Sequence, residues 1–208
     1  MTRQELDKMI SKWEKDFNPR AYTNFIGDTQ YDDRSALINY CMIREYKPTN
    51  VLEFGARFGR CTRDIMQALR DNGKKFKFKS CELDNDLRRT AQASLDNEFG
   101  TGAIELGADV LQEELPKNLD YVFVDHSHDE PMSRWVLDTL IPNHCKDGAI
   151  IQIHDLPLFG DWEIRENPWN ETSMIKDRHL AGTLKLEKIY WTYEEGDRWE
   201  STWWKYKA

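Results

Sequence analysis

The spacing of apolar residues changes character along the chain. Over residues 1–17 apolar side chains recur every three or four positions, which predicts an amphipathic helix that ends at Asn18-Pro19. Residues 21–32 are polar with one glycine and predict a cover or entry segment. A second amphipathic helix is predicted over residues 33–46, and Lys47-Pro48 ends it.

The middle of the chain alternates between short apolar runs and segments with helical spacing. The apolar runs predict strands at residues 50–54, 75–83, 103–106, 121–124 and 148–153. The helical spacing predicts helices at residues 61–71, 86–99 and 131–141, with a short turn or helix at 113–115. This alternation implies right-handed crossovers and a parallel sheet with helices on both faces.

The C-terminal region follows a different pattern. Residues 183–193 and 198–206 are aromatic, β-rich runs separated by a turn signal at residues 194–197, which predicts an antiparallel hairpin. An α/β core that ends in such a hairpin is not the arrangement of a nicotinamide-binding domain.

Composition and charge exclude several classes of protein. The formal net charge of −8 argues against nucleic acid as the main partner, because a phosphate backbone needs a basic footprint. No apolar run approaches the ~20 residues of a membrane span, and the N-terminal helix lacks the apolar region of a signal peptide. The cysteines form no C-x-x-C pair, so neither a zinc ribbon nor a redox dithiol is indicated, and we expect a cytoplasmic protein.

The stretch from Val51 to Arg60 carries the first functional signal. A buried strand runs into the pattern E-x-G-x-x-x-G, formed by Glu53, Gly55 and Gly59, and a helix follows. A tight turn at a helix N-terminus presents free backbone N–H groups to a ligand above the strand. The spacing differs from the G-x-G-x-x-G of dinucleotide binders. The pattern predicts a cofactor-binding turn. The alternative is that the two glycines serve only packing.

Acidic residues gather where the predicted strands end, which is where ligands of open α/β sheets bind. Glu53 closes the first strand, Glu82 and Asp84 the second, and Asp109 follows the third. A carboxylate at the end of the second strand accepts the ribose hydroxyls of an adenosine ligand, and we assign that role to Glu82. Asp84 is better placed to cap the next helix.

The fourth and fifth strands end in a second polar group. Adjacent strands place Asp125 close to His154 and Asp155, and two carboxylates with an imidazole suit a divalent metal. The alternative is that Asp125 caps a helix while His154 hydrogen-bonds within the core. His128 follows Asp125 by three residues and is a candidate base near neutral pH, while His126 is placed to stack on an adenine.

Several of these motifs occur together in one known family. Residues 43–48 followed by 51–56 closely resemble the catechol O-methyltransferase group of class I S-adenosylmethionine (SAM)-dependent methyltransferases. Further matches follow in register: Glu82, Gly107-Ala108-Asp109, Phe123-Val124-Asp125-His126 and Gly148 through Asp155. The resemblance covers roughly residues 36–156 and the terminal hairpin. It implies a Rossmann-like, seven-stranded, mostly parallel methyltransferase sheet with helices on both faces.

The resemblance also implies a domain layout and a set of site residues. The single domain 1–208 would comprise an N-terminal helix and cover segment (1–32), a cofactor-binding core (33–155), and a substrate loop with the hairpin (156–208). The implied SAM-binding residues are Glu53, Gly55, Ala56, Arg57, Gly59, Cys61, Glu82, Leu83, Ala108, Asp109, Asp125 and His126. Asp125, His154 and Asp155 occupy the metal-ligand positions, and His128 stands where catechol methyltransferases place a catalytic lysine.

The fifth strand departs from the family pattern, which is Asp-Asn or Asp-Asp. His154 supplies a nitrogen ligand here, which shifts the preference from magnesium toward manganese, iron or zinc. We therefore expect metal-assisted O-methyl transfer to a hydroxylated small molecule such as an aromatic, a sugar or a natural product, with Asp125 and His128 as the catalytic residues. A nicotinamide-dependent oxidoreductase and a non-catalytic cofactor-binding subunit are the alternatives.

The acceptor site is expected outside the cofactor-binding core. Residues 21–30 and the loop 156–177, which carries Phe159, Trp162, Pro168 and Trp169, are its candidates. Six of the eight tryptophans follow Gly160, which suggests an aromatic pocket or a homodimer face. Packing in the hairpin and core is the simpler expectation for Trp191, Trp199, Trp203 and Trp204.

Overall fold

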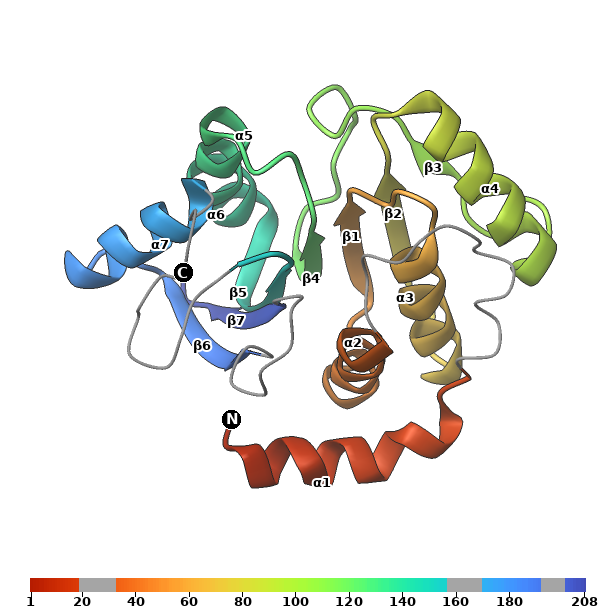
Figure 1. Cartoon of the computed structure of the whole chain (residues 1–208), viewed down its shortest axis with the longest axis horizontal. Helices are drawn as coiled ribbons and strands as arrows, with labels where there is room; N and C mark the ends of the chain where they lie inside the picture. Colours follow the sequence, from red (N-terminus) through yellow and green to blue (C-terminus); the bar gives the residue numbers. More distant parts are fainter. Residues whose placement is uncertain (19–32, 157–169, 192–200) are drawn as a thin grey trace. The chain divides into compact units, whose positions relative to one another are not determined.

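The computed structural model describes residues 1–18, 33–156, 170–191 and 201–208 (Figure 1). The chain divides into two compact units, Met1–Leu115 and Pro116–Ala208. Together their seven strands make the predicted Rossmann-like fold class, mostly parallel with antiparallel C-terminal strands. No helix among the described residues has the length and apolar character needed to cross a membrane.

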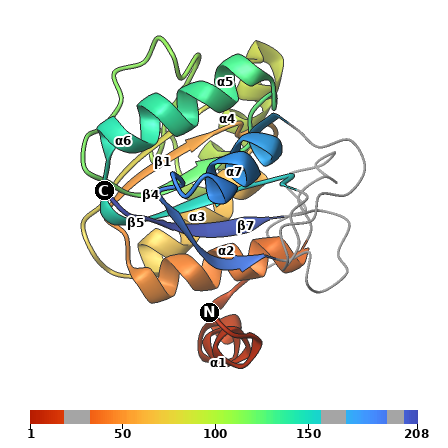
Figure 2. The ribbon, with the colours of Figure 1, turned by 90° about the vertical axis from the view of Figure 1, so that its left-hand side faces the viewer.

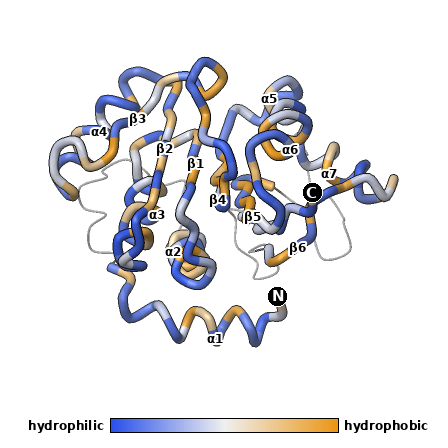
Figure 3. Tube along the Cα trace, turned by 180° about the vertical axis from the view of Figure 1, so that it is seen from behind, coloured by the Kyte–Doolittle hydropathy of each residue, from blue (hydrophilic) through white to orange (hydrophobic). Residues whose placement is uncertain are grey.

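The first unit contains three parallel strands in the order β3-β2-β1 and the helices around them. Its elements are α1 (Arg3–Trp13), η1 (Glu14–Asp16), α2 (Asp33–Tyr46), β1 (Asn50–Phe54), α3 (Arg60–Asp71), β2 (Lys77–Cys81), α4 (Asn85–Phe99) and β3 (Leu106–Gly107). Orange segments alternate with blue along α1 in Figure 3, as expected for an amphipathic helix. Met66 of α3 and Leu95 of α4 share an apolar cluster with Leu106 of β3.

The second unit contains four strands in the order β4-β5-β7-β6. Its elements are β4 (Leu119–Val124), α5 (Glu130–Trp135), the π-helical η3 (Val136–Leu140), α6 (Ile141–His144), β5 (Cys145–Ile153), α7 (Asn170–Leu180), β6 (Leu186–Trp191) and β7 (Thr202–Tyr206). β4 and β5 are parallel, whereas β7 is antiparallel to both β5 and β6. Figure 2 shows β5 and β7 side by side, with α5 and α6 following one another as one run.

Aromatic residues of the C-terminal strands fill the core of the second unit. Trp191, Trp203 and Trp204 are fully buried, which confirms that these tryptophans serve packing. The Trp203 indole N–H donates to the Tyr121 hydroxyl, which donates to Gln152 Oε1. This buried chain of hydrogen bonds joins β7, β4 and β5. Trp199 and the predicted turn at residues 194–197 lie outside the described residues.

The structure corrects three predicted elements. The third strand is two residues long and begins at Leu106, because Ala103 and Ile104 belong to a turn that follows α4. Residues 113–115 form no helix. The predicted loop 156–177 is helical from Asn170 onward, in α7. The remainder of that loop, with Phe159, Trp162, Pro168 and Trp169, and the segment 21–30 lie outside the described residues.

A buried ion cluster in α3 gives a test of the first unit. Arg63 and Asp64 are fully buried and paired at 3.0 Å, and Arg63 Nε also lies 2.8 Å from Glu98. We expect Asp64→Ala to lower the free energy of unfolding by about 3–5 kcal/mol, because it leaves a buried guanidinium without one partner. Urea unfolding followed by circular dichroism measures this change.

The matched control is an exposed ion pair in α5. Glu130 and Arg134 lie 2.7 Å apart with both side chains more than half exposed, so Glu130→Ala should change stability far less. Equal effects of the two substitutions would contradict the structural role of the buried pair.

Candidate functional site

The glycine turn after β1 is fixed by hydrogen bonds to the end of β2. The N–H groups of Gly55 and Ala56 both donate to the Cys81 carbonyl oxygen, at 3.0 and 3.2 Å. Gly55 and Gly59 have φ values of 85° and 87°, which L side chains rarely adopt, so these glycines are required by the backbone. Arg57, between them, also has a positive φ of 50°.

Glu82 at the end of β2 is tied to this turn. Its Oε2 accepts the Arg57 backbone N–H at 2.6 Å, and its Oε1 accepts the Asp84 N–H at 2.9 Å. The carboxylate is thereby held in one position before any ligand arrives. Asp84 caps α4 by accepting the N–H groups of Asp86 and Leu87, which confirms the role predicted for it.

The helix that follows the turn has an unusual first turn. The N-cap of α3 is Gly59, which offers no side-chain oxygen, and the first turn contains no acidic residue. The partial positive charge at this helix end is therefore not neutralised from within the helix. Cys61 lies in that first turn and accepts a hydrogen bond from the Asn39 side chain at 3.5 Å.

The remaining residues predicted to bind SAM in the first unit have different environments. Glu53 is wholly buried on β1 and accepts the Ser80 hydroxyl of β2. Asp109 closes a local turn, accepting the Leu111 N–H and the Gln112 amide at 2.9 Å each. The Ala108 N–H donates to Glu113. Leu83 is 74% exposed, so an apolar surface lies beside Glu82.

In the second unit, parallel pairing of β4 and β5 brings the predicted metal residues together. Val124 is paired with Ile153, and the His154 N–H donates to the Val124 carbonyl oxygen at 2.9 Å. His154 Nδ1 lies 3.7 Å from Asp125 Oδ1 and 3.2 Å from Asp155 Oδ1. Asp125 does not cap α5, because the N-cap is Asp129, which accepts the Met132 N–H.

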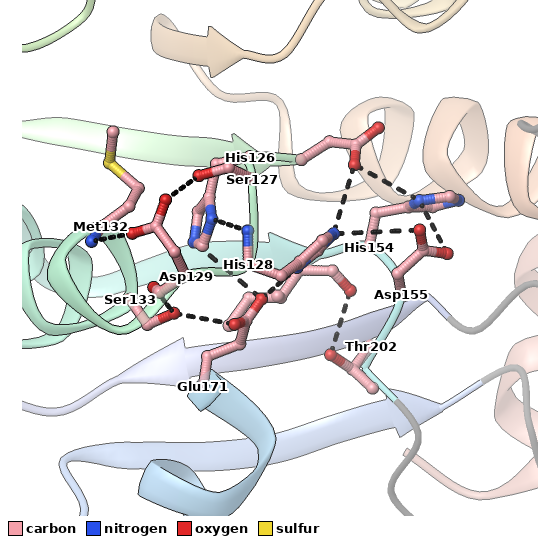
Figure 4. Close-up of polar contacts among 12 residues, drawn as sticks. His126, Ser127, His128, Asp129, Met132, Ser133, His154, Asp155, Glu171 and Thr202 are labelled. Atoms are coloured by element: carbon pink, nitrogen blue, oxygen red, sulfur yellow. Dashed lines mark hydrogen bonds and ion pairs between the residues drawn. The ribbon is translucent and has the colours of Figure 1, made fainter. Parts of the chain in front are cut away.

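His128 faces the same two carboxylates from another direction (Figure 4). Its Nε2 lies 3.9 Å from Asp125 Oδ1 and 3.8 Å from Asp155 Oδ2. Both His128 and Asp155 have positive φ values, 56° and 54°, a conformation that is uncommon outside glycine and is found often at functional sites. The structure thus brings Asp125, His154 and Asp155 close together, as predicted, and places His128 beside the two carboxylates.

Glu171 of α7 was missed by the sequence patterns. It is buried, and its carboxylate hydrogen-bonds His128 Nδ1 and the Ser133 hydroxyl (Figure 4). The buried positions at the start of α7 are Glu171, Thr172 and Ile175, and two of the three are polar. Apolar periodicity therefore carried no signal for this helix.

The histidine predicted to lie near the adenine is turned inward. His126 Nδ1 accepts the His128 backbone N–H at 2.8 Å, and its Nε2 lies 3.9 Å from Glu171 Oε1. Burial lowers the pKa of His126, although the charge of Glu171 opposes the shift. His126 is thus favoured as a neutral ring whose proton is on Nε2.

The acidic neighbours shift the pKa values of the two other histidines upward. Burial of His154 opposes protonation, but Asp125 and Asp155 outweigh it and raise the pKa of His154 to about 10. Burial likewise opposes protonation of His128, but the Glu171 hydrogen bond and the charges of Glu171, Asp125 and Asp155 raise its pKa. Burial of Glu171 favours its neutral form, but its bond to His128 lowers the pKa of this carboxyl.

Two groups of side chains have donor atoms close enough to share one metal ion. They are Asp125, His128 and Asp155, and His126, His128 and Glu171, in each of which the donor atoms lie within 4.8 Å of one another. Carboxylate oxygens combined with imidazole nitrogens are a donor set suited to a divalent transition metal. The first group contains both carboxylates of the predicted metal site but has His128 in the place of His154, which belongs to neither group.

Comparison with known proteins places the chain in a family. A family model described as a methyltransferase domain matches residues 52–156, half of the chain. The chain belongs to the methyltransferase-domain family. The matched residues include the glycine turn, Glu82 and the ends of β4 and β5. No curated protein sequence matches this methyltransferase.

Solved structures share the fold of this methyltransferase at low sequence identity. The O-methyltransferase TomG from Streptomyces achromogenes, involved in tomaymycin synthesis and solved with SAM, is 16% identical with a TM-score of 0.67 over 96% of this chain and 90% of its own. An O-methyltransferase from Bacillus cereus, solved with SAH, is 10% identical with a TM-score of 0.66, covering 95% and 90%. The SAH-bound methyltransferase PaMTH1 from Podospora anserina is 14% identical with a TM-score of 0.65, covering 100% and 97%.

The opposite pKa shifts of His128 and Glu171 predict how their contribution to stability depends on pH. The raised pKa of His128 means that its contribution is present below the ordinary value of 6.5 and is lost as pH rises through the folded-state pKa. The lowered pKa of Glu171 means that its contribution is present above 4.5 and is lost as pH falls through the folded-state pKa. The full contribution of the pair therefore lies between pH 4.5 and 6.5.

We expect Glu171→Gln to destabilise the methyltransferase more at pH 5.5 than at pH 9. Urea unfolding of the substituted and original proteins at both pH values, in excess chelator, measures the two differences. A destabilisation that grows toward pH 9 would contradict the ionised pair.

Proposed function

We propose that this protein transfers a methyl group from SAM to a hydroxyl oxygen of a small molecule, assisted by a divalent metal. The observation that carries the proposal is the gathering of Asp125, His128, His154 and Asp155 at the ends of β4 and β5 in a chain of the methyltransferase family. TomG and the Bacillus cereus enzyme, which share the fold, are O-methyltransferases solved with SAM or SAH.

The residues of the first unit fit the chemistry of SAM. The fixed carboxylate of Glu82 is suited to accept both ribose hydroxyls, and the exposed side chain of Leu83 offers an apolar surface to the adenine. The N-terminus of α3 with Cys61 is suited to the negative end of the amino-acid moiety. Gly55, Ala56, Arg57 and Gly59 shape this turn, and we keep Glu53, Ala108 and Asp109 as further SAM-binding residues.

The second unit supplies the donor set for a metal and a base. Asp125, His154 and Asp155 would hold the cation, and when bound the cation would orient the acceptor hydroxyl and lower its pKa. His128 Nε2 would take the hydroxyl proton, since it lies on the side of Asp125 and Asp155. We also keep Asp125 and His126 as SAM-binding residues.

The proposed methyl transfer breaks two bonds and forms two. The acceptor O–H bond breaks as its proton moves to His128 Nε2, and a new O–C bond forms to the methyl carbon of SAM. The S–C bond breaks, and its electron pair stays on sulfur, giving SAH and a methyl ether. Orientation of the acceptor and stabilisation of its developing negative charge account for most of the acceleration in such a transfer.

The donor set and the net charge both bear on the class of acceptor. The metal-binding donor set favours an acceptor with a second oxygen beside the reacting hydroxyl, as in vicinal diols of aromatics, sugars and natural products. The net charge of −8 disfavours nucleic acid. We propose a cytoplasmic enzyme that acts on neither nucleic acid nor a membrane, and that forms a homodimer.

Glu82 tests the SAM assignment. We expect Glu82→Ala to weaken SAM binding roughly 10- to 100-fold in isothermal titration calorimetry, because hydrogen bonds to a charged group contribute about 1.5–3 kcal/mol. Asp86→Ala is the control, since the Asp86 side chain is 93% exposed at the start of α4, the helix that follows Glu82. The assignment would be overturned if the unsubstituted protein did not bind SAM, or if Glu82→Ala left SAM binding unchanged.

Asp125 tests the metal assignment. Methyl incorporation from labelled SAM is measured with catechol, a hexose and a hydroxylated polyketide as acceptors, with Mn²⁺ or with excess chelator. We expect Asp125→Ala to abolish turnover while SAM binding stays largely intact, and we expect chelator to have the same effect. Asp138→Ala, in an exposed pair with Arg178, is the control. Full activity in chelator, or in Asp125→Ala, would refute the metal role.

A further inference from the structure

Glu171 is a buried acid that neither the family match nor the predicted site includes. It lies on α7, beyond residues 52–156 that match the family model. Its side chain is 3% exposed, so an ionised carboxylate there needs hydrogen bonds and a positive neighbour to be stable. His128 and Ser133 supply the hydrogen bonds, and both residues belong to the segment that follows β4.

The two ring nitrogens of His128 face different partners (Figure 4). Nδ1 bonds to Glu171 Oε1, whereas Nε2 faces Asp125 and Asp155 at 3.9 and 3.8 Å. An ionised carboxylate accepts hydrogen bonds and donates none, so the proton of a neutral His128 ring belongs on Nδ1. The lone pair of Nε2 is then directed to the side of Asp125 and Asp155.

Glu171 is itself held from several sides. Its Oε2 lies 2.8 Å from the Ser133 hydroxyl, which also lies 2.6 Å from the Asp129 carbonyl oxygen. His126 faces Oε1 with its Nε2 at 3.9 Å, and its Nδ1 accepts the backbone N–H of His128. These contacts fix the carboxylate relative to the His128 backbone, which is already constrained at a φ of 56°.

We propose that Glu171 is the positioning residue for the His128 base. It holds the ring with Nδ1 protonated and with Nε2 directed toward Asp125 and Asp155. When Nε2 takes the acceptor proton, the acceptor O–H bond breaks, an Nε2–H bond forms, and the fixed negative charge of Glu171 stabilises the imidazolium. Glu171 remains ionised throughout, as the acid of a Ser-His-Asp triad does. This inference rests on the proposed function, in which His128 is the base.

The same side chains could instead bind a metal, since His126, His128 and Glu171 form one of the two groups with closely spaced donor atoms. The hydrogen bonds argue against that use. His126 Nδ1 is engaged with the His128 N–H, and His128 Nδ1 is engaged with Glu171, so only His126 Nε2 and the carboxylate would remain. A cation at this place would have to displace the bond that orients His128.

The tautomer of His128 is the decisive observation. Long-range ¹H–¹⁵N NMR spectra of protein labelled in its five histidines distinguish protonated from unprotonated ring nitrogens, and His128→Asn assigns the His128 signals. At a pH where the ring is neutral, we expect Nδ1 to carry the proton in the unsubstituted protein. Glu171→Ala should move the proton mainly to Nε2, while Glu171→Gln, whose side-chain oxygen still accepts, should keep it on Nδ1.

Thr172→Val is the matched control, because Thr172 is buried next to Glu171 on the same helix. It should leave the His128 tautomer unchanged. A proton on Nε2 in the unsubstituted protein would overturn the proposal even if Glu171→Ala does not fold. An unchanged tautomer in folded Glu171→Ala would overturn it as well.

The affinity for a metal ion shows whether His128 acts as a base or as a metal ligand. We expect Glu171→Ala and His128→Asn to change the Mn²⁺ dissociation constant less than about threefold in calorimetry. A 10- to 100-fold weakening, the effect expected when an outer carboxylate orients a metal-bound histidine, would make His128 a ligand and overturn its assignment as the base. Absence of SAM binding would refute the proposed function alone, because the tautomer is measured without SAM.

Discussion

The parallel pairing of β4 with β5 is the constraint on which the chemistry of the second unit depends. Residues 121–124 of β4 and 149–153 of β5 are buried, and a shift of one residue would move each side chain of a strand to the opposite face of the sheet. The register that pairs Val124 with Ile153 is therefore strongly specified. It leaves Asp125 beside His154 at the point where both strands end. The polar cluster follows directly from this hydrophobic register.

In the first unit the corresponding constraint is the bond between Glu82 and the backbone of Arg57. In the turn after β1, three alternate residues have positive φ: Gly55, Arg57 and Gly59. The Cys81 carbonyl and the Glu82 carboxylate hold that conformation through hydrogen bonds from the turn. The contacts that stabilise the turn thus also fix the carboxylate of Glu82, which we propose binds the ribose.

The sequence was most informative where a periodic apolar pattern met a strand end. The pattern located β1, β4 and β5, and with them Glu53, Asp125 and His154, because buried strands are continuous apolar runs. It was least informative where polar residues are buried. Glu171 and Thr172 are inside the protein but polar, so α7 was predicted as part of a loop. Its partner His128 is 43 residues away, a distance that no local pattern spans.

Two ionic clusters in this chain differ in the kind of positively charged side chain that they contain. In the first cluster Asp64 and Glu98 pair with the guanidinium of Arg63, whose charge is permanent. In the second cluster the carboxylates of Asp125, Asp155 and Glu171 face imidazoles, which can be neutral or protonated, and they raise the pKa of His128. Burying charge is costly in both places, and apolar residues would stabilise the core equally well. The cluster with titratable side chains is therefore the one that suits the proposed proton transfer and metal binding, whereas the guanidinium cluster suits a structural role.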